Sequence, residues 1–194
     1  MKDLNIQIQI PKTNVVVEKV LMFNPFQVIG IEQKFSLDLN ELEQKYLDLM
    51  KTYHPDKVVG VEDPNQRISF ISKSTQINDA YNILKDDLKR GQVIIDLEKD
   101  HQHFNENVVK QDAEFIFLQI QMREQIDKLS RNFVEQEFNN LKTKAKSLVN
   151  ENKQALEQAF IENNLELAQK LVYRLQFLAK LKSEIEKVED EQLI

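Results

Sequence analysis

Cysteine is absent from the 194-residue sequence. A chain without thiols forms no disulfide and offers no thiol nucleophile, and it supplies no cysteine ligand to zinc or to an iron–sulfur cluster. The absence of cysteine also fits a reducing compartment. We therefore look for the function among contacts and charges rather than in thiol chemistry.

Glycine and proline are scarce as well, with 3 and 4 residues respectively. Few turns are therefore expected, while hydrophobic residues at 41% suffice for a core and charged residues reach 30%. This composition is typical of a mostly helical globular protein, and the length allows one ordinary domain or two small ones.

Long apolar runs and clusters of positive charge are also missing. No stretch approaches the roughly 20 apolar residues that a transmembrane helix needs, so we predict no membrane association. The formal net charge is −6 and the basic residues are dispersed, which argues against nucleic-acid binding. Because the N-terminus lacks the character of a transit peptide, we expect a bacterial cytoplasm, with a mitochondrial matrix as the alternative.

Residues 1–21 differ from the rest of the sequence. "IQIQI" at 6–10 alternates with the period of a strand, "VVVEKV" at 15–20 is β-branched, and "PKTN" lies between them. We interpret the segment as an extension that is either a small β-hairpin or disordered, and we assign it no chemistry.

Helical signals begin at Asn24, a capping residue followed by Pro25, and Gly30 fits the end of a short helix. A second helix is predicted from the capping residue Asp38 to about residue 53, and a third begins after Asp63 and its following proline. Both longer helices place a stripe of mainly apolar residues on one side at helical spacing, which predicts an antiparallel pair packed through these two stripes. They are Leu39, Leu42, Tyr46, Leu49, Met50 and Tyr53 on one helix, and Phe70, Ser74, Ile77, Tyr81 and Leu84 on the other.

The tripeptide His54-Pro55-Asp56 joins these two helices. Proline keeps the residue before it out of the helical conformation and fixes its own φ, so it ends the helix in a stiff turn. The Asp56 carboxylate is then held outward, where a partner arginine can bind both oxygens. The simpler interpretation is that the tripeptide merely ends a helix. A catalytic His–Asp pair is disfavoured because the proline directs the two side chains apart and no nucleophile motif accompanies them.

Beyond a polar junction at 99–109, the pattern predicts helices over about 110–130, 132–162 and 165–192, with a break at Asn163-Asn164. Three helices with short connections indicate an antiparallel bundle over 110–194. His101 and His103 lie in the junction without carboxylates or thiols at ligand spacing, so we interpret them as solvated and predict neither a metal nor any cofactor.

The first part of the chain resembles the J-domain, in which an HPD tripeptide lies between two antiparallel helices. "INDAYNILKD" at 77–86, followed by "LKRGQVI", matches the later helix of that family. The resemblance implies a J-domain over 22–98 in which His54, Pro55 and Asp56 stimulate ATP hydrolysis by a DnaK/HscA-type chaperone. It also implies that basic residues near the turn contact that chaperone; the matching positions are Lys45, Lys51 and Lys57.

The whole domain order resembles the HscB family, J-type co-chaperones of iron–sulfur cluster assembly. "DAEFIFLQIQMREQIDKL" at 112–129 and "LVYRLQFLAKLKSEIEKVE" near the end carry this resemblance. It implies that the bundle binds an IscU-type iron–sulfur scaffold protein and that the protein is no enzyme itself. The implied contacts are Ile116, Phe117, Ile120, Gln121, Glu124 and Phe177.

Helical periodicity indicates a binding face at the same place. Ile116, Phe117 and Ile120 fall almost opposite the predicted core stripe of their helix, while Tyr173 and Phe177 stand off the stripe of the last one. Bulky apolar residues outside a core stripe are candidates for partner contact, although a helix buried on two sides gives the same pattern.

We therefore predict an all-α co-chaperone, in which a J-domain made of the antiparallel helix pair and short flanking helices is followed by a C-terminal three-helix bundle. Two rival interpretations remain: a J-domain protein with a different client, and a helical scaffold in which the HPD turn is incidental.

Overall fold

The computed structural model of the chain describes residues 23–60, 62–99 and 112–192. The extension at 1–21, nearly all of the junction at 99–109, and both of its histidines lie outside this part, so the predictions made for them stay predictions.

The described residues form an all-α molecule, as predicted. The elements of the first part are α1 (Pro25–Ile29), α2 (Leu39–Tyr53), the 3₁₀ helix η1 (Pro55–Gly60), α3 (Pro64–Leu84) and α4 (Asp87–Lys99). Three long helices follow, α5 (Ala113–Arg131), α6 (Glu135–Ile161) and α7 (Leu165–Gln192). Within the described segments, no helix is both long enough and apolar enough to cross a bilayer.

The helices begin where the capping residues place them. The side chain of Asn24 accepts from the backbone N–H groups of Phe26 and Gln27, at 3.0 and 3.2 Å. Asp38 accepts from the N–H of Asn40 at 2.8 Å, and Asp63 starts α3 in the same way. Each cap satisfies a donor that the first turn of a helix leaves free. All three predicted starts are confirmed.

The α2–α3 hairpin is held by aromatic and polar contacts between its two helices. The Tyr46 and Tyr81 rings stack with centroids 4.2 Å apart, and the Tyr46 hydroxyl donates to the Asn78 side chain at 2.8 Å. Nearer the tip, the Tyr53 and Phe70 rings lie 5.7 Å apart. The predicted antiparallel pair is therefore confirmed, with the His54–Asp56 stretch at its tip. Leu39, predicted in the packed stripe of α2, is 53% exposed instead.

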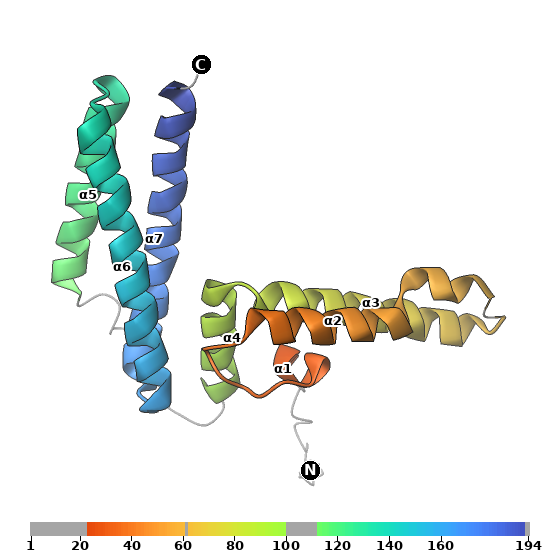
Figure 1. Cartoon of the computed structure of the whole chain (residues 1–194). Helices are drawn as coiled ribbons and strands as arrows, with labels where there is room; N and C mark the ends of the chain where they lie inside the picture. The colour runs from red at the N-terminus through yellow and green to blue at the C-terminus, as the bar shows by residue number, and fades with distance from the viewer. Residues whose placement is uncertain (1–22, 61, 100–111, 193–194) are drawn as a thin grey trace, which may run out of the picture.

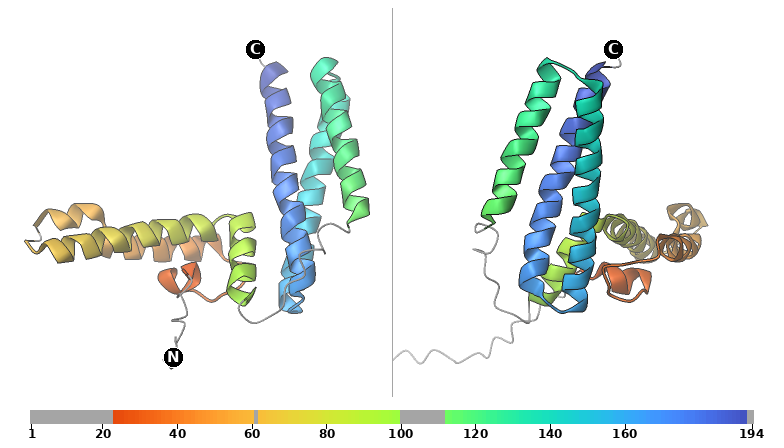
Figure 2. Two further views of the ribbon diagram at one scale, coloured as in Figure 1. Left: turned by 180° about the vertical axis from the view of Figure 1, so that it is seen from behind. Right: turned by 60° about the vertical axis from the view of Figure 1, so that its left-hand side comes forward.

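The described residues are arranged in two arms, α1 to α4 in the first and α5 to α7 in the second (Figure 1). The α2–α3 hairpin projects sideways from α4, and α5, α6 and α7 stand across it as a bundle. All three views place α5 on the side of the bundle away from the hairpin tip (Figures 1 and 2).

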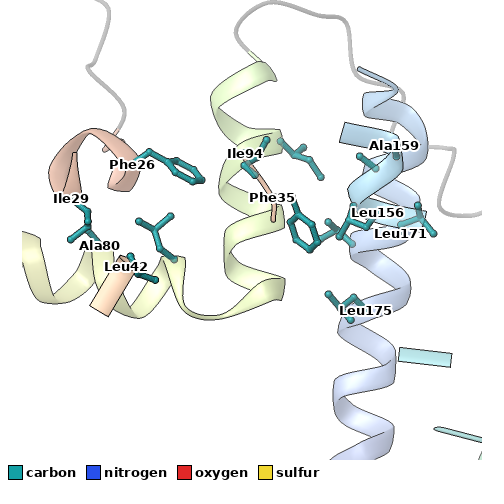
Figure 3. Packing of buried hydrophobic residues seen from close by; sticks show 14 of the residues in the cluster. Phe26, Ile29, Phe35, Leu42, Ala80, Ile94, Leu156, Ala159, Leu171 and Leu175 are labelled. Atoms are coloured by element: carbon teal, nitrogen blue, oxygen red, sulfur yellow. The ribbon is translucent and has the colours of Figure 1, made fainter. Parts of the chain in front are cut away.

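One hydrophobic core joins these arms, and we call it the junction core. Figure 3 shows Phe35 of the first arm pointing toward Leu156 of the second. Its buried members come from α1, α2, α3 and α4, from the loop before α2, and from α6 and α7: Phe26, Ile29, Phe35, Leu42, Ile77, Ala80, Leu84, Ile94, Ile95, Leu156, Ala159, Ala168, Leu171, Val172 and Leu175. The predicted limits of the two domains, 22–98 and 110–194, remain a prediction, because this core draws on both.

Helix α4 makes this junction tight. A Cβ placed on Gly91 would lie 3.0 Å from Val172 Cγ2 of α7 and 3.4 Å from Leu156 Cδ2 of α6, so only glycine allows this approach without displacement. Beside it, the buried Arg90 donates to the Phe35 carbonyl at 2.6 Å and pairs with Asp87, which also pairs with Lys153 of α6. These contacts connect the arms with charge as well as with apolar packing.

A second cluster, the bundle core, fills the other half of the bundle. It consists of buried residues from α5, α6 and α7: Phe115, Met122, Ile126, Leu129, Phe138, Leu141, Ala145, Phe177, Leu178, Leu181, Ile185 and Val188. Helix α7 contributes to both cores, so its two halves belong to different packing units.

Candidate functional site

The predicted turn lies at the hairpin tip and is exposed. His54 follows α2 with an extended backbone (φ −61°, ψ 136°), the conformation that a following proline requires, and Pro55 opens η1. The backbone N–H of Lys57 donates to the His54 carbonyl at 3.0 Å, and that of Asp56 donates to His54 Nδ1 at 3.2 Å. Two hydrogen bonds within four residues thus hold the turn in one conformation.

Asp56 presents its carboxylate to solvent. Its side chain is 87% exposed, and its Oδ2 atom lies 3.4 Å from His54 Nδ1. The prediction that Pro55 directs these two side chains apart is therefore wrong, because the hydrogen bond from the Asp56 N–H to Nδ1 turns the imidazole toward residue 56. Both oxygens are accessible to an incoming guanidinium or ammonium group, which is the arrangement that two-point recognition of a carboxylate requires. His54, Pro55 and Asp56 therefore form a stiff acceptor, as the sequence predicts, and are not packed beneath other structure.

The three predicted basic contacts are engaged in local interactions. Lys45 Nζ donates to the Gly30 carbonyl at 2.7 Å and lies 3.5 Å from Glu41. Lys51 pairs with Asp48 at 2.7 Å, and the hydrogen bond from Lys51 is the largest influence that lowers the pKa of Asp48. Lys57 Nζ donates to the Lys51 carbonyl at the end of α2. Their positive charge is thus partly balanced within the hairpin.

The second candidate site is a mixed surface on α5, which we call the α5 face. Ile116, Phe117 and Ile120 are exposed, Phe117 to 61%, and two exposed polar residues follow them, Gln121 and Glu124. The opposite side of the helix is buried through Phe115, Met122, Ile126 and Leu129. The predicted division of α5 into a core stripe and an outward apolar face is confirmed.

Phe177 does not belong to this exposed surface. It is only 7% exposed and packs edge-on against Phe115, with ring centroids 5.6 Å apart. The prediction that it stands off the core of its helix is wrong, because α7 packs against both α5 and α6 and is therefore buried over a wider arc than one stripe. Tyr173, predicted with it, is exposed to 42%.

Sequence reasoning missed one polar cluster next to the α5 face. Arg174 of α7 binds both carboxylate oxygens of Asp112, at 2.6 and 2.8 Å, and Lys170 lies 3.4 Å from the same carboxylate. Burial raises the pKa of Asp112, but the hydrogen bonds and charges of Arg174 and Lys170 outweigh it, so the net pKa lies below its ordinary value. No sequence signal pairs residues 62 positions apart.

The described ranges contain no group of three or more histidine, aspartate or glutamate side chains that could hold a metal ion. The candidate sites are therefore two surfaces, one polar and one largely apolar, carried on different arms.

Comparison with known proteins identifies both arms. A family model described as "DnaJ domain" matches residues 24–93, and one described as "HSCB C-terminal oligomerisation domain" matches residues 111–186. The co-chaperone protein HscB homolog of Haemophilus influenzae is 35% identical over 169 residues, which cover 87% of this chain and 97% of that protein. The homolog of Mannheimia succiniciproducens is 34% identical over 172 residues, with the same two shares covered.

Solved structures agree in fold. The chaperone HscB from Vibrio cholerae superposes with a TM-score of 0.76 at 28% identity, covering 87% of this chain and 98% of that one. The human co-chaperone protein HscB gives a TM-score of 0.75 at 20% identity, covering 86% and 82%, and so shares the fold. With a J-domain arm, a matching C-terminal arm and relatives matched over nearly their whole length, this chain belongs to the HscB family of J-domain co-chaperones.

Proposed function

We propose that the protein is a co-chaperone of iron–sulfur cluster assembly that works through two protein contacts and performs no covalent chemistry. The turn at His54, Pro55 and Asp56 binds a DnaK/HscA-type chaperone and stimulates its ATPase. The α5 face binds an IscU-type iron–sulfur scaffold protein and delivers it to that chaperone. Family membership supports the chaperone class, since a J-domain is the part of such proteins that addresses an Hsp70-type ATPase.

The observation that carries the proposal is the exposed carboxylate of Asp56, carried on a backbone that two hydrogen bonds hold in one conformation. Because the backbone of the turn is already ordered, binding a partner cation costs little further backbone entropy, so more of the interaction energy is retained. Lys45, Lys51 and Lys57 surround this contact in a supporting role, because each of them already has a partner in the hairpin.

The apolar character of the α5 face supports a protein as its ligand. Adjacent exposed apolar side chains on one helix are unusual in the absence of a partner, and a flat helical surface suits a folded protein better than a small molecule. Ile116, Phe117 and Ile120 would supply the apolar contact, with Gln121 and Glu124 at its polar edge. Phe177 would support this surface from beneath.

The junction core gives the two contacts a fixed relation. Because the arms share one core, a scaffold protein on α5 is carried at a set position relative to a chaperone at the hairpin tip. Such bivalency raises the effective concentration of the scaffold protein at the chaperone without any new contact. The bacterial relatives favour the expected bacterial setting, which remains a prediction.

Single-turnover ATP hydrolysis by the chaperone tests the proposal. We expect Asp56→Asn to abolish stimulation at concentrations where the unaltered protein saturates the effect, since losing one member of an interfacial charge pair costs about 2–5 kcal/mol. Thermal stability should stay unchanged, because the side chain lies outside both cores.

Asp79→Asn is the matched control, the same change at an exposed position on α3 of the same hairpin. It should leave stimulation intact. Full stimulation by Asp56→Asn would show that the turn is incidental and would favour the helical-scaffold interpretation.

A further inference from the structure

Asp112 occupies the position from which a helix is usually capped, yet its side chain does not cap α5. The backbone there has φ −88° and ψ 64°, and no side-chain hydrogen bond to the first turn forms. Aspartate is among the strongest N-cap residues, so the start of α5 lacks the stabilisation that a capping hydrogen bond would give. The Asp112 carboxylate is turned toward α7 instead.

There it meets two cations one turn apart on α7. Arg174 donates from Nε and from a terminal nitrogen to the two carboxylate oxygens, a bidentate arrangement, and Lys170 approaches within 3.4 Å. Asp112 is only 5% exposed, so water contributes little to its solvation. A bidentate pair fixes both the distance and the orientation of the two chains that carry it.

Further contacts between α5 and α7 follow, in which two arginine side chains lie over two packed phenylalanine rings. The Arg174 guanidinium lies over the Phe115 ring, 5.0 Å from its centroid, and Phe115 meets Phe177 edge to face. Arg123 of α5 then lies over the Phe177 ring at 5.1 Å. We call this run of side chains the α5 clamp: Asp112, Phe115, Arg123, Arg174 and Phe177.

The clamp holds the part of α5 that carries the α5 face. The Asp112 carbonyl accepts from the backbone N–H of Ile116 at 3.0 Å, so the first residue of that face is bonded to the residue that Arg174 fixes. Over the first two turns Phe115 is the one buried apolar residue of α5, and Leu118 is only partly buried. The next buried residue, Met122, follows two turns after Phe115. Apolar packing alone thus anchors the start of α5 weakly.

We propose that Asp112 and Arg174 are positioning residues for binding of the iron–sulfur scaffold protein. They keep the first two turns of α5 seated on α7, so that Ile116, Phe117 and Ile120 are presented as a preformed surface. This inference rests on the proposed function of the α5 face. Buried ion pairs contribute little net stability compared with apolar side chains of similar size, and one of their attested uses is to specify geometry.

A preformed surface affects affinity in a measurable way. When only a fraction of molecules has the binding-competent conformation, the apparent dissociation constant rises by the inverse of that fraction. If the start of α5 is seated for about a tenth of the time once the clamp is broken, affinity falls about tenfold. Contacts at the hairpin tip are unaffected.

The test uses the full chain and two variants, Arg174→Met and the combination of Arg174→Met with Asp112→Asn. Methionine keeps a flexible apolar stem over Phe115, and the combination leaves no unpaired charge at the site. Scaffold affinity is measured by calorimetry with an IscU-type protein, amide hydrogen exchange is measured for residues 116–120, and chaperone ATPase stimulation is measured without scaffold. Lys182→Met, which removes an exposed cation from the same helix, is the matched control.

We expect both variants to weaken scaffold affinity about tenfold and to accelerate amide exchange at residues 116–120. ATPase stimulation and the control should stay as in the unaltered protein. Unaltered affinity in the combined variant would overturn the inference. Any loss of affinity in Arg174→Met alone would then come from the unpaired Asp112 carboxylate and not from lost positioning of α5. Unaltered exchange at residues 116–120 would overturn it as well.

Ile120→Ala separates this inference from the proposed function. If Ile120→Ala weakens scaffold binding and the clamp variants do not, the α5 face binds the scaffold and the positioning role is wrong. If Ile120→Ala has no effect either, the scaffold binds elsewhere and the cargo half of the proposed function fails.

Discussion

The hairpin tip and the α5 face are both exposed, but they are built over very different distances along the chain. The tip is held by hydrogen bonds among His54, Asp56 and Lys57. The start of α5 is held by Asp112 and Arg174, which lie 62 residues apart. A short polar motif can therefore specify its own geometry, whereas an apolar binding surface depends on a partner helix to position it.

The two regions also differ in what lies beneath them. The side chains of His54, Pro55 and Asp56 belong to neither core, so substitutions of these three residues should alter partner binding and leave folding intact. The α5 face is the outward side of a helix whose inward side fills the bundle core. Substitutions at the tip should therefore affect binding without affecting stability. On α5 this holds only for the outward residues, because the inward ones fill the bundle core.

The largest effect is expected where α5 and α7 share an aromatic contact. Phe177→Ala removes a buried ring that packs against Phe115, and such truncations cost about 3–5 kcal/mol. Chemical denaturation should show this loss, and scaffold affinity should fall with it. Ile120 is exposed on the neighbouring helix α5. Ile120→Ala should lower scaffold affinity and change the free energy of unfolding by less than about 0.5 kcal/mol.

Equal destabilisation by the two substitutions would contradict this contrast, because Ile120 would then belong to the core. Chaperone stimulation serves as the internal reference for both variants. It should persist wherever the chain remains folded, because the tip is on the other arm (Figure 1).

Residues close in sequence made most of the fold predictable. Asn24, Asp38 and Asp63 mark helix starts because a cap acts within three residues, and the apolar stripes of α2 and α3 show which sides meet. Asn163 adopts φ 53° and separates α6 from α7 at the predicted break. The exposed carboxylate of Asp56 was predictable for a similar reason, since Pro55 restricts the backbone conformation of the residue before it and ends the helix there.

Other features escaped the sequence because they depend on what packs from a distance. The sequence predicts only short flanking helices beside the hairpin, whereas α4 has 13 residues. A local signal for its start exists, because the side chain of Asp86 accepts from the Lys89 N–H as a cap. The burial of Phe177 and the pairing of Asp112 with Arg174 depend on how three helices lie together. A period of 3.6 residues gives the direction of a side chain but not the number of neighbours around a helix.

An intermediate effect is expected where the two arms meet. Gly91→Val would place methyl groups against Val172, Leu156 and Phe35, all of them buried, and overpacking of this kind costs about 1–3 kcal/mol. Because both arms share the junction core, one cooperative unfolding transition of reduced midpoint should appear in calorimetry. Two separate transitions in the unaltered protein would show instead that the arms unfold independently. The claim that the junction core fixes the two binding sites relative to each other would then be wrong.

The smallest effect should come from acid, and it distinguishes the buried clamp from the exposed hairpin. The pKa of Asp112 is lowered in the folded protein, so its pairing stabilises the fold fully above the ordinary aspartate pKa of 3.8. That contribution declines as the pH falls through the depressed pKa. The gap in melting temperature between the unaltered protein and Asp112→Asn should therefore be constant near neutral pH and shrink below about pH 4.

Asp48→Asn is the comparison for this titration, since the pKa of Asp48 is also lowered, mainly by its hydrogen bond to Lys51. The Asp48 side chain is 57% exposed, and solvent-exposed pairs contribute little. Its melting temperature should follow that of the unaltered protein at every pH. If Asp48→Asn shows the larger pH-dependent gap, the hairpin depends on its surface charges more than α5 depends on its clamp. The contrast between a locally held tip and a helix held from a distance would then be reversed.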